Sequence, residues 1–269
     1  MNSKHIKNHL NKKINDWVEY VDDEEIKDII KKNAIISGGA IVSLLTGEDV
    51  HDYDVYFKTK DSVIKIAEYY VEKWNKKHGE CLEVIEDGER IKIFVKSKGI
   101  AEDENDDKSK LKYMPKFITS NAITLTDKIQ IVVRFYGDIK EIHKNYDYAH
   151  CTCAWDAKKN KLFLPEKALE CIINKELYYI GSKYPLCSIF RARKYMNRGY
   201  TINAGQYLKM AMQLNELDLT DIDVLEDQLI GVDSSYFQMI IDAVREQKGK
   251  KNEFNIDSSY ISEIVDKVF

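Results

Sequence analysis

Apolar and polar residues recur along this chain with two different periods, and the change of period divides it. Short stretches between residues 34 and 160 alternate with a period of two, as β-strands do. The regions before and after them repeat every three to four residues, as amphipathic helices do. The runs that predict strands are "NAIIS", "DYDVYF", "CLEVIED", "RIKIFVK", "ITSNAITL", "IQIVVRF" and "DYAHCTCAW". The ranges that predict helices are two within 1–33, then 61–78, 166–178, 186–198, 203–216, 221–230, 234–247 and 258–268.

This pattern predicts an α+β fold with three parts. Residues 1–33 form helices that pack on a head, residues 34–160 form the head around a mixed sheet, and residues 161–269 form an all-helical part. The stretch "GIAEDENDDKSK", near 99–112, has clustered acids and no apolar anchor, which predicts a mobile loop inside the head.

The stretch "ISGGAIVSLLTGEDVHDYDVYF" contains the candidate chemistry. A buried strand enters the glycine pair Gly38 and Gly39, a short helix follows, and then an acidic strand begins. With a period of two, Asp52, Asp54 and Tyr56 share one face of that strand, while the apolar residues between them face the core. Two carboxylates about 7 Å apart on one face repel each other unless a cation lies between them. The pattern therefore predicts a divalent metal site.

Composition predicts the cellular compartment of the protein and the charge of its partners. The 269 residues carry a net charge of −4, and the five cysteines are an odd number scattered along the chain, which predicts reduced thiols. No apolar run is long enough to span a membrane, and the polar start has no signal-peptide pattern, so a cytoplasmic protein without a membrane partner is expected. Lys and Arg far outnumber Glu from Ala157 to Lys209, whereas Asp and Glu dominate from Met210 to Glu246, which favours a groove for a polyanion or ordinary surface charge.

The stretch "GGAIVSLLTGEDVHDYDVY" resembles the first motif of the nucleotidyltransferase superfamily, in the head of bacterial-type CCA-adding enzymes and poly(A) polymerases. "DYAHCTCAWDAKKNKLFLPEKALECI" is similar in rhythm to a second strand of that family, and "RARKYMNRGYTI" resembles the arginine helix of its neck. The similarity covers about residues 34–202. It implies a polymerase-β-like head and template-independent, metal-dependent transfer of a nucleoside monophosphate from an NTP to an RNA 3′ end, tRNA included.

The resemblance also implies roles for single residues. Asp52, Asp54 and Asp147 would be the catalytic carboxylates and would hold two Mg²⁺ ions, with Mn²⁺ as an alternative. Ser37, Gly38 and Gly39 would approach the β- and γ-phosphates. The remaining assigned residues are basic: Arg191 and Lys194 for the nucleotide, and Arg193 and Arg198 for RNA.

A helical wheel supports a basic ridge within about 60° at Arg191, Lys194 and Arg198, opposite an apolar stripe of Leu186, Ile189, Ala192 and Met196. The ridge binds triphosphate or RNA backbone, or is simply solvated. Arg193 projects from the apolar side, either as a paired buried arginine or as a cleft residue.

Several motifs of the family are absent from the sequence. The Arg-Asp pair that follows the glycines in the family is Val42-Ser43, the two arginines before the third carboxylate are Asn145-Tyr146, and the Glu-Asp-x-x-Arg motif has no counterpart. Two alternatives therefore stay open beside the RNA acceptor. The chain modifies a protein or a small molecule, as toxin-type members of the superfamily do, or it is a catalytically degenerate head that acts as a binding module.

Overall fold

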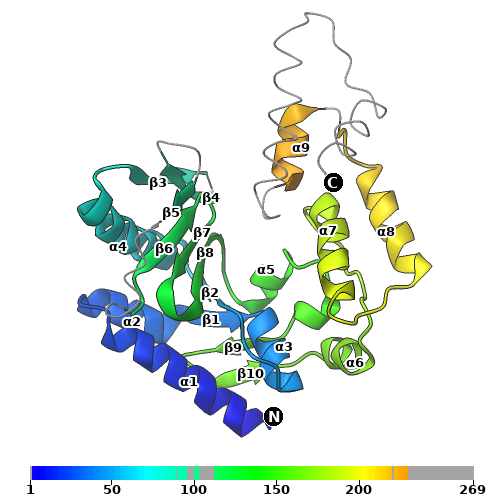
Figure 1. The fold of residues 1–269 in the computed structure, drawn as a ribbon, viewed down its shortest axis with the longest axis horizontal. Coiled ribbons are helices and arrows are strands. Elements are labelled where there is room, and N and C mark those ends of the chain that lie inside the picture. Colours follow the sequence, from blue (N-terminus) through cyan, green and yellow to red (C-terminus); the bar gives the residue numbers. More distant parts are fainter. Residues whose placement is uncertain (1, 89, 96–99, 103–111, 220, 230–269) are drawn as a thin grey trace, which may run out of the picture. The chain divides into compact units, whose positions relative to one another are not determined.

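The computed structural model describes residues 2–88, 90–95, 100–102, 112–219 and 221–229 (Figure 1). The predicted acidic loop lies largely outside the described residues, and the predicted helices at 234–247 and 258–268 lie entirely outside them. The chain divides into two units, which are described separately below. The first comprises Met1–Tyr146 and His150–Ile172, and the second comprises Asp147–Ala149 and Ile173–Phe269.

The first unit is built on an eight-stranded sheet in its described part, with the strand order β10-β9-β1-β2-β8-β7-β6-β5. All neighbours are antiparallel except β2 and β8, which run parallel, so the sheet is mixed as predicted. The strands are β1 (Ala34–Ser37), β2 (Tyr53–Phe57), β5 (Ile100–Glu102), β6 (Pro115–Thr119), β7 (Ala122–Leu125), β8 (Ile129–Tyr136), β9 (Ala154–Asp156) and β10 (Lys161–Phe163). The α+β prediction is thereby confirmed.

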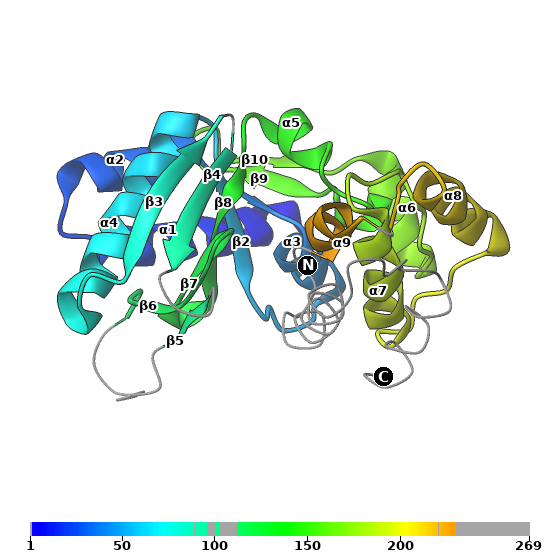
Figure 2. The same ribbon diagram turned by 90° about the horizontal axis from the view of Figure 1, so that it is seen from above.

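The main core lies on one face of this sheet. Helices α1 (Ser3–Glu19), α2 (Glu24–Asn33) and α4 (Lys60–His78) bring apolar side chains to it, together with alternate residues of the strands (Figure 2). Side chains at the N-termini of these helices cap them: Asn2, Asp23 and Thr59 each accept a hydrogen bond from a backbone N–H of the first turn. The largest fully buried side chains include Trp17, whose indole N–H donates to the Tyr70 hydroxyl. The two predicted helices within 1–33 are thus confirmed.

A separate hairpin contributes to the same core. Strands β3 (Leu82–Asp87) and β4 (Arg90–Val95) pair antiparallel, as their alternation predicted, and Ile91 and Ile93 are buried in the main core.

The run "DYAHCTCAW" was wrongly predicted to be one strand. A 3₁₀ turn at Ala149–Cys151 interrupts it, and only Ala154–Asp156 pairs in the sheet. Its cysteines, like the other three, are thiols rather than disulfides.

The opposite face of the sheet has a smaller apolar cluster under α5 (Ile139–His143). Ile35, Tyr56, Ile142 and Ala154 are buried there, and Tyr146 packs against them. The cluster covers the face around β1 and β2, while the positions at Asp54, Gln130 and Thr124 on the same face are only half-buried. Part of this face therefore remains open within the first unit.

Helices make up most of the described part of the second unit: α7 (Pro185–Met196), α8 (Ala204–Leu214) and α9 (Ile222–Leu229). Helix α6 (Glu166–Asn174) leads into it and ends four residues earlier than predicted, because Lys175 has a left-handed φ of 52° and Leu177 donates its N–H to the Thr201 carbonyl instead. The core is rich in tyrosine: Tyr148, Leu177, Tyr179, Ala192, Tyr200 and Met210. Within the described residues, no helix has the length and apolarity that crossing a membrane requires.

Candidate nucleotide site

The glycine pair forms the junction between β1 and α3 (Gly39–Thr46). Gly38 has a φ of 85° and a ψ of −138°, a conformation open essentially to glycine alone. A Cβ at this position would lie 3.4 Å from Tyr146 Oη and 3.7 Å from Asp54 Oδ2. Among the described residues, no side chain caps the N-terminus of α3. The absence of a side chain at Gly38 thus brings the uncapped backbone N–H groups of the turn close to the carboxylate of Asp54, and such N–H groups bind anions.

Replacing Gly38 with alanine is expected to destabilise the protein by roughly 1–3 kcal/mol, because alanine must be forced into this conformation. A urea titration of the variant measures the loss. Gly47 also has a positive φ, 80°, in the left-handed helical region, and nothing lies within 4 Å of its Cβ position, so Gly47→Ala is the control for strain at a glycine away from Asp54. Equal loss of nucleotide binding in both variants would contradict a specific role for the turn at Gly38.

The acidic strand is oriented as its alternation predicted. Tyr53, Val55 and Phe57 belong to the main core, and Asp54 lies on the other face. Asp54 is paired with Ser37 on β1 and with Gln130 on β8. Asp52 is exposed and directly precedes β2. The two carboxylates therefore lie at the start of a central strand, and that of Asp54 lies next to the glycine turn.

A partly buried polar network holds the strand residue that precedes this turn. The Ser37 hydroxyl donates to the Cys153 carbonyl at 3.0 Å and lies 2.9 Å from His143 Nε2. Since serine has one hydroxyl proton, His143 must be the donor in the second contact. Tyr146 donates to the Tyr56 hydroxyl at 3.2 Å, and burial, with the nearby Tyr56 and Asp54, raises the pKa of Tyr146 well above its ordinary value. The Ser37 hydroxyl is thus engaged inside the protein, and its predicted contact with nucleotide stays a prediction.

This network predicts an acid-sensitive stability. Burial lowers the pKa of His143 to about 4, so the folded state holds the ring neutral while the unfolded state takes up a proton near pH 6.5. The stabilisation is present above pH 6.5 and is lost as the pH falls towards 4, by about 2–3 kcal/mol once partial exposure is allowed for. His143→Gln, which keeps a donor but does not titrate, should flatten the dependence of the urea midpoint on pH in this window. The exposed His51→Gln should leave that dependence unchanged.

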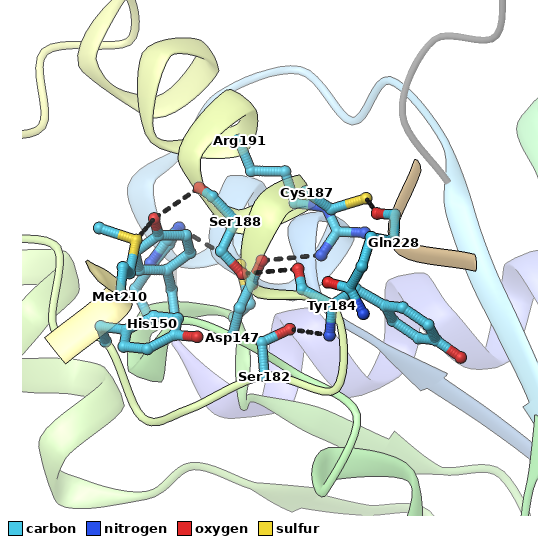
Figure 3. Close-up of polar contacts among 12 residues, drawn as sticks. Asp147, His150, Ser182, Tyr184, Cys187, Ser188, Arg191, Met210 and Gln228 are labelled. Atoms are coloured by element: carbon cyan, nitrogen blue, oxygen red, sulfur yellow. Dashed lines mark hydrogen bonds and ion pairs between the residues drawn. The ribbon is translucent and has the colours of Figure 1, made fainter. Parts of the chain in front are cut away.

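The third predicted carboxylate lies in the second unit. Asp147 begins the three-residue segment that pairs with residues 178–180: its carbonyl accepts from Ile180 N–H at 2.9 Å, and Ala149 N–H donates to the Tyr178 carbonyl at 3.0 Å. Its side chain is 5% exposed and its Oδ2 lies 2.7 Å from Arg191 Nη1 (Figure 3). Burial lowers the pKa of Arg191, but Asp147 more than offsets this, so the pKa lies above its ordinary value. Asp147 is therefore in a buried ion pair, and its predicted metal contact stays a prediction.

The basic ridge differs from its helical-wheel prediction. Helix α7 ends at Met196, so Arg198 lies in the following turn rather than on the helix. Arg191 is half-buried against Asp147, whereas Arg193 and Lys194 are exposed, which corrects the prediction that Arg193 is a buried or cleft residue. Binding of nucleotide or RNA by these four basic residues stays a prediction.

The apolar stripe of α7 was predicted correctly only in part: Ala192 is buried and Leu186 is half-buried, but the other two members are exposed. Ile189 and Met196 are 38% and 46% exposed, and the buried residues of the helix are Pro185, Cys187, Ser188 and Ala192. The reason is Tyr148, which is fully buried and donates its hydroxyl to the Ser188 carbonyl at 2.7 Å. Small residues on this face of α7 make room for the aromatic cluster.

The donors of the first unit fit a metal that arrives with a nucleotide. Mg²⁺ is held through one or two carboxylates together with substrate phosphates, and it keeps several waters. Asp52 and Asp54 supply two carboxylates, and the glycine turn beside them has backbone N–H groups for phosphate. In the described part of the chain, no three His, Cys, Asp or Glu side chains gather in a way that could hold a metal ion by themselves.

The sequence comparisons give one family. The model of a family described as "Gad2: Gabija anti-defense 2 family protein" matches residues 8–175. A curated relative, "Gabija anti-defense 2" of Bacillus phage SPbetaL7, is 23% identical over 256 residues, which cover 91% of this chain. The chain spans 55% of that relative's length.

The structure comparison gives tRNA nucleotidyltransferases, the group that the sequence motifs resemble. The CCA-adding enzyme of Thermotoga maritima, complexed with tRNA, is 14% identical with a TM-score of 0.41, over 89% of this chain and 53% of that one. The CCA-adding enzyme of Bacillus stearothermophilus, in complex with CTP, is 14% identical with a TM-score of 0.34, over 77% of this chain and 47% of that one.

Proposed function

Because this chain belongs to the Gabija anti-defense 2 family, we propose that it counteracts Gabija defence, and that it does so by metal-dependent transfer of a nucleoside monophosphate from an NTP. The observation that carries the reaction class is the contact between the glycine turn and the acidic strand. A Cβ at Gly38 would lie only 3.7 Å from Asp54 Oδ2, so the turn and this carboxylate are neighbours. A triphosphate on the turn would therefore have its phosphates beside the carboxylates.

The site residues of the first unit then have the following roles. The N–H groups at Gly39 and the start of α3 bind the β- and γ-phosphates, while the Gly38 N–H holds the turn by donating to the Cys153 carbonyl at 3.1 Å. Asp52 and Asp54 hold the cation, which, when bound, neutralises phosphate charge and favours displacement at the α-phosphorus. The network of Ser37 and His143 keeps the turn in place and adds no charge, because the ring of His143 is neutral at physiological pH.

The proposal also includes Asp147, the four basic residues of α7 and the turn after it, and an RNA acceptor. Asp147 is the third ligand only if its carboxylate exchanges the Arg191 guanidinium for the cation. Arg191 and Lys194 remain candidates for the triphosphate, and Arg193 and Arg198 remain candidates for RNA phosphates. RNA, tRNA included, is the acceptor that the resemblance implies.

Nucleotide binding and pyrophosphate release test the reaction class directly. We expect the purified protein to bind at least one of the four NTPs in Mg²⁺ or Mn²⁺, to lose that binding in EDTA, and to release pyrophosphate when an acceptor is present. Binding of equal strength without divalent cation, and no pyrophosphate with any NTP, would overturn the proposal.

A further inference from the structure

The acceptor side of the site has a surface of its own. Four strands lie next to each other in the order β1, β2, β8, β7, and their paired residues form one row across the sheet face opposite the main core. The row consists of Ser37, Asp54, Gln130 and Thr124, and Phe117 on β6 continues it. Neighbours in such a row have their Cβ atoms about 5 Å apart. We call Gln130, Thr124 and Phe117 the neutral strip.

The order of the strands indicates on which side of Asp54 the leaving phosphates lie and on which side the attacking group approaches. The glycine turn follows β1, so the phosphates that leave would lie on the β1 side of Asp54. Displacement at phosphorus is in line, with the attacking oxygen opposite the leaving oxygen. The attacking group would therefore approach from the β8 side, over the neutral strip.

The neutral strip has hydrogen-bonding groups to offer. Gln130, Thr124 and Phe117 are each half-buried. Among the described residues, neither the side-chain amide of Gln130 nor the Thr124 hydroxyl takes part in a hydrogen bond with the protein. An amide, a hydroxyl and an aromatic ring suit an uncharged polar group carried on a partly apolar side chain.

The three residues of the strip include no Lys or Arg, and two described cations of β8 and its preceding turn have partners within the protein. Arg134, near the end of β8, is 8% exposed, with its guanidinium 5.6 Å from the ring centre of Phe135. Lys128 donates to the Val50 carbonyl at 2.7 Å, and the exposed Asp52 adds negative charge. Binding of RNA depends on Lys and Arg that neutralise its phosphates. The strip itself supplies none of this positive charge, which favours an acceptor without a phosphate backbone.

We propose that the acceptor is a hydroxyl-bearing side chain of a protein, held over the neutral strip; this inference rests on the proposed function. The hydroxyl oxygen of Ser, Thr or Tyr attacks the α-phosphorus of the NTP and forms a phosphodiester. The bond from the α-phosphorus to the bridging oxygen breaks, pyrophosphate leaves with the electron pair, and the hydroxyl proton passes to water.

The test follows the label from α-³²P NTPs, with Mg²⁺, into an extract of Bacillus cells that carry Gabija defence. We expect acid-stable label that protease removes and ribonuclease leaves. Label that ribonuclease removes would overturn this inference and leave the proposed function standing. No label on any macromolecule, with pyrophosphate still released, would overturn this inference alone, whereas neither label nor pyrophosphate would overturn the proposed function as well.

A strip variant separates acceptor binding from nucleotide binding. Gln130→Ala should lower protein labelling by at least tenfold while the affinity for NTP with Mg²⁺, measured by calorimetry without acceptor, stays within twofold. Gln130→Glu should also lower labelling. Lys116 is exposed, directly precedes Phe117 on β6 and lies outside the strip. Lys116→Ala is therefore the matched control, and its protein labelling should equal that of the wild type. Unchanged labelling by Gln130→Ala would overturn the placement of the acceptor.

Discussion

Asp54→Asn is expected to abolish Mg²⁺-dependent nucleotide binding and to reduce nucleotidyl transfer by at least roughly 10²–10³-fold, the size of effect seen when one preorganised electrostatic group is removed. The physical reason is the position of Asp54. It lies beside the glycine turn on the face of β2 opposite the core, and its Oδ2 lies 3.7 Å from the Cβ position at Gly38. Asparagine keeps the shape of the side chain and removes the charge that holds the cation.

The fold should tolerate this change. Asp54 contributes no apolar packing to the main core, and its replacement by asparagine would relieve repulsion between the two carboxylates in the absence of metal. Urea unfolding of Asp54→Asn should therefore match or slightly exceed the stability of the wild type. Asp49→Asn, an exposed acid in the same connection, is the control and should keep full binding.

The same variants connect the chemistry with defence. In Bacillus cells that carry Gabija, expression of the wild-type chain should restore phage plating, and Asp54→Asn should not. Full restoration by an Asp54→Asn protein that binds no nucleotide would show that the chain counteracts the defence without transfer, as a binding module.

Local features of this site could be predicted from the sequence. The alternation in "DYDVYF" correctly assigned Tyr53, Val55 and Phe57 to the core, because a strand buried on one face has little freedom of register. The glycine pair predicted a turn between strand and helix, and Gly38 has the positive φ that requires glycine. Both results depend on neighbours within a few residues of one another.

The neutral strip and the surroundings of Asp147 could not be predicted in this way. Gln130 follows Asp54 by more than seventy positions, and only the order of strands in the sheet, with β8 parallel to β2, places them side by side. His143 follows Ser37 by 106 positions, and Tyr146 follows Tyr56 by 90. The sequence signal that could have pointed to Gln130 is its polar character inside the apolar alternation of "IQIVVRF".

The error in α7 has a different cause. A helical wheel counts apolar residues and assigns the apolar stripe to the core, but this core is filled by tyrosines that come from other segments. The rings of Tyr179 and Tyr195 lie 5.9 Å and 5.7 Å from that of Tyr148, and both contacts are T-shaped. Because these rings need space and hydrogen-bond acceptors, α7 presents Ser188 and Ala192 to them and leaves Ile189 exposed.

Arg191→Met is expected to destabilise the protein by about 2–3 kcal/mol. The variant leaves the carboxylate of Asp147, 5% exposed, without the guanidinium 2.7 Å away, and an unpaired buried charge costs several kcal/mol. The estimate is set below the usual cost of breaking a fully buried pair because Arg191 is itself 31% exposed. Lys194→Met, an exposed position on the same helix, is the control and should change the stability by less than about 0.5 kcal/mol.

A double-mutant cycle decides between the two roles of Asp147. If the ion pair fastens the Asp147–Ala149 segment to α7, Asp147→Asn should cost about 1–2 kcal/mol, since the remaining arginine keeps contact with water, and Asp147→Asn combined with Arg191→Met should recover most of the loss caused by Arg191→Met alone. Urea unfolding of the four proteins without nucleotide measures the coupling. If Asp147 instead serves the cation, Asp147→Asn should leave the urea midpoint unchanged and weaken Mg²⁺-dependent nucleotide binding as strongly as Asp54→Asn does. That result would contradict a fastening role for the pair, because the energy of the carboxylate would then appear only when the metal is bound.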